Sequence, residues 1–122
     1  MIKKILIALA IVLVLIQFIR PAKNDAGGVV YSMPTGYNVP PEVNVILKPA
    51  CLDCHSNVTH YPWYSNIQPA AWFLANHVKE GKEHLNFSEF TNRRIAYQHH
   101  KFEEIVEIVK KKEMPLPSYT WF

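Results

Sequence analysis

The chain has 122 residues, of which 49% are hydrophobic, and this length allows one domain of ordinary size. Its formal net charge is +3, but part of this excess flanks an apolar N-terminal segment and the remainder is nearly balanced, so we do not expect nucleic-acid binding. A domain this small buries little apolar area and commonly needs a cofactor, a metal, a disulfide or a partner for part of its stability.

An apolar segment opens the chain. Residues 5–19 are apolar except for Gln17. As a helix they would span about 22 Å, less than the roughly 30 Å of a bilayer core, but Lys4 and Arg20 flank them and can extend their reach, and no clear cleavage site follows. We therefore predict that residues 1–21 form an uncleaved signal anchor, and a cleaved signal peptide stays open as the alternative. This transmembrane helix would make the protein a single-pass protein of the cytoplasmic (inner) membrane, with its domain facing the periplasm.

The rest of the chain divides by composition. Residues 22–39 are rich in Asn, Gly and Pro and are predicted to be a flexible tether, followed by a domain over residues 40–122. Apolar residues at helical spacing predict helices over 42–47, 69–81 and about 92–111. No strand and no repeat is indicated. The predicted fold class is therefore all-α.

The two cysteines of the chain stand in the run Cys51-Leu52-Asp53-Cys54-His55. This spacing is the c-type haem attachment pattern. Two cysteines three positions apart can reach the two vinyl groups of a porphyrin, and the adjacent histidine can then serve as the proximal iron ligand. The motif predicts one covalent haem c held by Cys51, Cys54 and His55.

A cysteine pair at this spacing can also serve other purposes. A thioredoxin-like redox pair needs a βαβ context that the sequence does not show. A zinc site needs a second ligand pair, and His77 and His84 are spaced too far apart for the usual one. A structural disulfide between Cys51 and Cys54 stays open as an alternative. The predicted export favours haem, because covalent attachment takes place outside the cytoplasmic membrane.

The sixth iron ligand decides what such a haem can do. Met114 follows the last predicted helix and precedes Pro115-Leu116-Pro117, an extended segment that can bring the thioether to the distal face. A methionine at a helix end can equally fill a gap in a core. His77, on the second predicted helix, is the alternative ligand.

The sequence resembles the small haem-binding domain proteins of bacterial envelopes that carry one CxxCH motif. The matching stretches are residues 16–21, 51–57, 61–65, 81–88 and 114–119. The resemblance implies haem c binding by Cys51, Cys54 and His55, and a place near the haem for residues 114–116. Members of that family usually continue with a His-Pro segment and a closing helix, whereas this sequence stops at Phe122. We therefore expect either that the third predicted helix takes the place of this closing helix or that the gene product is truncated.

Together these features predict a small cytochrome c-like helical domain around one haem. The leading expectation is one-electron transfer to or from an unidentified redox partner protein, without a catalytic residue set. Two alternatives stay open. One is a five-coordinate haem that senses a gas or reduces peroxide, and the other is a haem-free domain with a Cys51–Cys54 disulfide.

Overall fold

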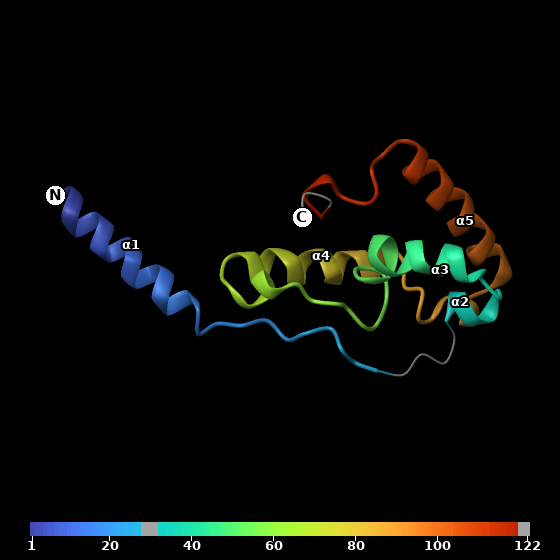
Figure 1. Ribbon diagram of the computed structural model, residues 1–122, viewed down its shortest axis with the longest axis horizontal. Helices are drawn as coiled ribbons and strands as arrows, with labels where there is room; N and C mark the ends of the chain where they lie inside the picture. The colour runs from blue at the N-terminus through green and yellow to red at the C-terminus, as the bar shows by residue number, and fades with distance from the viewer. Residues whose placement is uncertain (28–31, 120–122) are drawn as a thin grey trace.

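The computed structural model describes residues 1–27 and 32–119, and within them the protein is helical (Figure 1). An isolated bridge between Asp25 and Val58 is the sole β pairing in these two ranges. The α-helices are α1 (Ile2–Ile16), α2 (Met33–Gly36), α3 (Pro41–Leu47), α4 (Ala70–His84) and α5 (Ile95–Lys110). Short helical turns are η1 (Lys48–Leu52), η2 (Trp63–Asn66), η3 (Phe90–Asn92) and η4 (Pro117–Tyr119). The predicted all-α class is confirmed.

The prediction of a transmembrane helix is wrong. Among the described residues, no helix is both long enough and apolar enough to cross a membrane. Helix α1 has 15 residues, and at about 1.5 Å per residue it falls short of a hydrocarbon core of about 30 Å. The predicted location as a single-pass protein of the inner membrane rested on this helix and is corrected with it.

The end of α1 is tied to the domain by an amide side chain. The Gln17 amide Nε2 donates to the Gln68 carbonyl at 3.3 Å, and the Gln68 backbone N–H donates to Gln17 Oε1 at 2.9 Å. The Gln68 side chain and the Trp72 indole both donate to the Ile19 carbonyl, at 2.6 and 3.1 Å. The one polar residue of the apolar segment therefore connects α1 to the start of α4.

The predicted helices of the domain are present with shifted ends. Helix α3 begins at Pro41, where a missing N–H costs nothing, and Pro49 does not end the helical path, which continues as the π-helical turn η1 through Cys51. Helix α4 runs three residues beyond Gly81. Helix α5 begins at Ile95, near the predicted start.

The hydrophobic core is small and is built mainly from loops. Its buried cluster consists of Met33, Leu85, Phe87 and Phe90. Residues from α3, η1 and α5 pack around it while half-buried, and Cys51 is one of them. Phe90 lies against Phe102 of α5, with ring centroids 5.1 Å apart. The core therefore reaches the cysteine motif.

The stretch 22–39 makes contacts with the domain at both of its ends. Met33 is a core residue, and the Tyr37 hydroxyl donates to Gln98 Oε1 at 2.5 Å. Asn24, near the other end, bonds to the loop that follows the cysteines. The middle of the predicted tether, residues 28–31, lies outside the described residues.

Candidate functional site

The cysteine motif begins on η1 and ends in a tight turn. The His55 N–H donates to the Cys51 carbonyl at 2.9 Å, which continues the helical path across the motif. Cys51 and Cys54 are both half-buried, and both are free thiols with no disulfide between them. Of the predicted attachment residues, Cys51 thus lies on η1, and Cys54 lies in the turn that follows it directly.

Burial keeps both thiols neutral. It raises the pKa of Cys51, and it is also the main cause of the raised pKa of Cys54. The Asp53 carboxylate and the neighbouring Cys51 raise the pKa of Cys54 further. Both sulfurs therefore carry their protons at neutral pH.

The His55 ring is fixed by backbone carbonyls at the end of α4. Its Nδ1 lies 2.8 Å from the Gly81 oxygen and 3.1 Å from the Leu85 oxygen. A carbonyl oxygen can only accept, so Nδ1 carries the proton, and Nε2 keeps its lone pair. Within the described part of the chain, Nε2 makes no hydrogen bond. The imidazole is therefore held in the tautomer that can ligate a metal through Nε2.

Gly81 permits this arrangement because it has no side chain. A Cβ at this position would lie 2.9 Å from the Cys54 carbonyl oxygen and 3.3 Å from its carbon. Real Cβ atoms essentially never approach an oxygen so closely. The glycine thus lets α4 touch the motif at the point where its own carbonyl meets His55.

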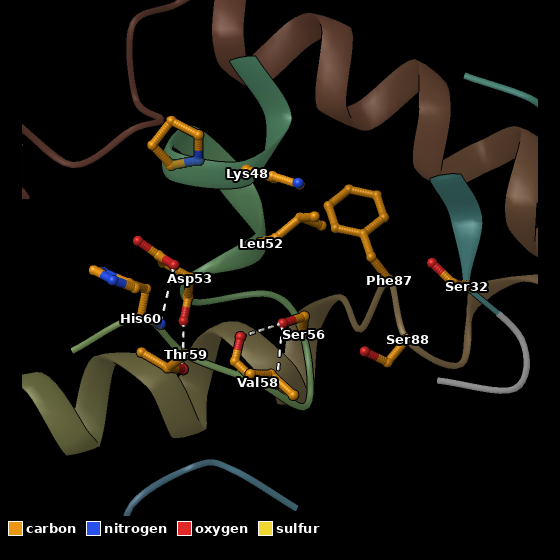
Figure 2. Close-up of a pocket in the computed structure, with 11 residues that line it drawn as sticks. Ser32, Lys48, Leu52, Asp53, Ser56, Val58, Thr59, His60, Phe87 and Ser88 are labelled. Atoms are coloured by element: carbon orange, nitrogen blue, oxygen red, sulfur yellow. Dashed lines mark hydrogen bonds between the residues drawn. The ribbon is translucent and has the colours of Figure 1, made fainter. Parts of the chain in front are cut away.

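Asp53, between the two cysteines, is the acceptor of three contacts. The Thr59 hydroxyl donates to its carbonyl at 2.6 Å, and the His60 N–H donates to Oδ1 at 3.1 Å (Figure 2). The Tyr119 hydroxyl donates to Oδ2. Asp53 therefore joins the loop after the motif and a segment 66 residues further along to the same turn.

Asn24 connects the N-terminal segment to the other side of this loop. Its amide Nδ2 donates to the Ser56 carbonyl at 2.8 Å and to the Thr59 hydroxyl oxygen at 2.9 Å. Its Oδ1 accepts from Lys82 Nζ on α4 at 2.7 Å. All hydrogen-bonding positions of the side chain are used, apart from one lone pair, so Asn24 fastens the loop to α4.

A cavity of about 500 Å³ lies beside the motif (Figure 2). Its walls include Leu52, Phe87 and Val58, with Lys48 and His60 among the polar residues. Neither cysteine nor His55 is among its lining residues. Leu52 and Asp53, between the cysteines, are the residues of the motif that line the cavity. The cavity therefore does not by itself mark where a group bound to the motif would lie.

The two predicted distal ligands have different surroundings. Met114 follows α5 and is 38% exposed. It belongs to the segment that returns from the end of α5 toward the motif, where Tyr119 meets Asp53 (Figure 1). His77 is half-buried on α4, where its Nδ1 bonds to the Phe73 carbonyl at 2.8 Å and its ring lies 4.2 Å from that of Phe73. Within residues 1–27 and 32–119, no three or more His, Cys, Asp or Glu side chains lie close enough together to hold a metal ion.

Four residues of this site were not predicted to have a role. They are Asn24, Asp53, Gly81 and Tyr119. Each acts through a contact between segments far apart in sequence, which spacing does not reveal. Three of them do fall in the stretches that carried the family resemblance, and this was the available signal.

These observations define a small helical domain built around a CxxCH turn whose histidine is oriented for metal ligation. Comparison with protein families matches residues 11–122 to the haem-binding domain. The chain therefore belongs to the haem-binding domain family, and its expected cofactor is haem. No curated protein and no solved structure matches the chain.

Proposed function

We propose that the protein binds one haem c through thioether bonds from Cys51 and Cys54, with His55 as proximal iron ligand, and that it transfers single electrons. The observation that carries this proposal is the state of His55. Its Nδ1–H is bonded to the Gly81 and Leu85 carbonyls, which leaves Nε2 free to ligate, and the two cysteines that precede it in the motif are free thiols.

The donor set fits covalent attachment. Each neutral thiol would add its sulfur to one carbon of a vinyl group and its proton to the other, so no oxidant or leaving group is needed. Both sulfurs lie on one turn that Asp53 and Asn24 fasten to its neighbours. The chain has no other cysteine that would compete for the two positions.

Residues around the motif also suit a flat apolar group. Helix α5 packs Phe102 and Ile105 against the core, but Val106 and Val109 on the same side of the helix are 52% and 50% exposed. An apolar stripe that continues past its core is incomplete without a further partner. A porphyrin attached to Cys51, which itself packs on the core, would supply such a surface.

The hydrogen bonds at Nδ1 would tune His55 as a ligand. A second-shell acceptor fixes the ring orientation and makes the ligating nitrogen more basic. Two backbone carbonyls provide this here without a titrating partner. When bound, the haem supplies a reversible one-electron couple, and the protein contributes the axial ligands that set its potential.

Met114 is the proposed sixth ligand, with His77 as its rival. Support comes from the Tyr119–Asp53 contact, which brings the segment containing Met114 to the motif. A histidine and a methionine together raise the reduction potential and leave no position on the iron open to small ligands. That pair suits an electron carrier that works with a redox partner.

The test is the mass and the spectrum of protein made in a host that attaches haem to CxxCH motifs. We expect one covalent haem adduct, which Cys51→Ala with Cys54→Ala abolishes and which His60→Ala, a matched histidine outside the motif, leaves intact. His55→Ala is expected to perturb the ligand-field spectrum even where an adduct forms. Absence of the adduct in the unaltered protein would overturn the proposal.

The same preparation tests electron transfer against a five-coordinate haem. With Met114 as ligand, the oxidised protein shows a weak sulfur-to-iron band at the red end of the spectrum, and Met114→Ala removes it. Loss of the band in His77→Ala alone would assign the rival ligand. Rapid carbon monoxide binding by the unaltered reduced protein would mean an open iron and a sensor or peroxide-reducing haem.

A further inference from the structure

We propose that Tyr119 is a positioning residue: its hydrogen bond to Asp53 holds the segment from Glu113 to Tyr119 against the cysteine turn and so keeps Met114 at the iron. The inference rests on the proposed haem function and adds to it the device that retains the distal ligand. The segment from Glu113 to Tyr119 is called the strap below.

The anchor point of the strap is rigid. Asp53 directly precedes Cys54, and its Oδ2 accepts from the Tyr119 hydroxyl. Its Oδ1 and its carbonyl are occupied by His60 and Thr59, so the carboxylate cannot turn away without breaking other bonds. A hydrogen bond to a charged acceptor is about twice as strong as one between neutral groups.

The strap itself has little freedom between its ends. At its start, the Glu113 N–H donates to the Ile108 carbonyl of α5 at 3.1 Å. At its end, the Tyr119 N–H donates to the Leu116 carbonyl at 2.9 Å within η4. Two prolines between these bonds fix further backbone angles. Because the strap is ordered at both ends, a displacement of Tyr119 would also displace Met114.

The distance along the chain is short enough for this role. Tyr119 comes five positions after Met114, so their Cα atoms lie at most about 18 Å apart even in a fully extended chain. The helical turn η4 shortens that reach. Fastening Tyr119 to the CxxCH turn therefore confines Met114 to the neighbourhood of the motif.

Packing alone holds the strap weakly. Met114 is 38% exposed, and Pro115 and Leu116 are only half-buried. A segment with few buried apolar contacts opens at low free-energy cost. The charged hydrogen bond at Asp53 is then a large share of what keeps the strap closed.

The test compares Tyr119→Phe, which removes one oxygen, with Tyr97→Phe as a matched control. Tyr97 makes ring contacts, and its hydroxyl has no hydrogen bond in the described ranges. In haem-loaded protein, we expect Tyr119→Phe to raise amide exchange across the strap and carbon monoxide association about tenfold, the equivalent of about 1.4 kcal/mol. The red sulfur band should weaken, and Tyr97→Phe should match the unaltered protein in all three readouts.

The outcomes separate this inference from the proposed function. If Met114→Ala removes the sulfur band while Tyr119→Phe leaves both band and strap exchange unchanged, the positioning role is overturned and the ligand assignment stands. If Met114→Ala leaves the band intact, the ligand assignment fails and the positioning role fails with it. Should Tyr119→Phe not accumulate, Asp53→Asn weakens the same bond by removing its charge, and the same readouts apply.

Discussion

At the scale of single residues, the site depends on contacts that place a reactive atom by means of a neighbour. His55 is oriented by carbonyl oxygens that belong to α4, and α4 approaches closely because residue 81 is glycine. The orientation of the His55 ring is thus set from outside the CxxCH motif. A change at Gly81 should act on His55 without touching it.

We expect Gly81→Ala to lower the free energy of unfolding by about 1–3 kcal/mol, the usual range for overpacking. Alanine gains about 1 kcal/mol of helix propensity over glycine, but the new Cβ would meet the Cys54 backbone oxygen at 2.9 Å, and backbone cannot rotate aside. Urea denaturation measures the change. Glu83→Ala, at an exposed position of the same helix, serves as control, and equal stability of the two variants would contradict the steric account.

Local spacing was enough to predict Cys51, Cys54 and His55 as a set, because the turn that joins them is only five residues long. It could not predict that Asp53 meets Tyr119 or that Gly81 meets Cys54. Those pairings depend on the path of the chain between them, which no local pattern contains. The roles of the predicted ligands toward haem stay predictions until the adduct is measured.

At the scale of elements, α5 was the best-predicted helix because its apolar residues repeat at helical spacing and its charges lie off that stripe. One of those charges has a changed pKa. Lys101 Nζ donates to Glu104 Oε2 at 2.6 Å, and this hydrogen bond is the main cause of the lowered pKa of Glu104. The lysine side chain is only 17% exposed, whereas the glutamate is 40% exposed.

A glutamate whose pKa is lowered by folding stabilises the protein at pH values above its ordinary 4.5, and this stability is lost as pH falls through the folded value. We expect Glu104→Gln to remove about 0.5 kcal/mol at pH 7, a size set by solvent screening of a part-exposed pair. Thermal melts at pH 7 and at about pH 3 measure it. The two proteins should converge at the lower pH, and Glu103→Gln on the same helix should show no such dependence.

The transmembrane prediction failed at this scale because α1 does not continue to the end of the apolar segment. Flanking charges were expected to extend the reach of residues 5–19, but the helix ends at Ile16. The next residue, Gln17, uses its side-chain amide to bond to Gln68 of the domain. The continuation of α4 past Gly81 was missed for a different reason. Glycine weakens a helix on average, yet here close packing needs it.

For the whole molecule, the core is small for the length of the chain. Four buried residues form its main cluster, and apolar side chains of α5 remain half exposed beside it. The all-helical class could be predicted from periodicity alone. The core could not, since three of its four members, Leu85, Phe87 and Phe90, lie in or beside a loop with no periodic pattern.

Haem loading should therefore stabilise the protein. Covering Val106 and Val109 would contribute about 2 kcal/mol, which corresponds to a rise of roughly 10 °C in Tm for a domain of this size. Differential scanning calorimetry of loaded protein against the double variant Cys51→Ala, Cys54→Ala from the same host measures it. Equal midpoints would contradict a role for haem in completing the core.

Four side-chain hydrogen bonds of the molecule join segments that are far apart in the sequence. Gln17 bonds to Gln68, Asn24 to Lys82, Tyr37 to Gln98 and Asp53 to Tyr119, across 51, 58, 61 and 66 positions of sequence. Helical proteins usually fold fast because their contacts are local, and long-range closures slow folding. The contacts that hold the cysteine turn are thus complete only after residue 119 has been made, since Tyr119 supplies the last of them.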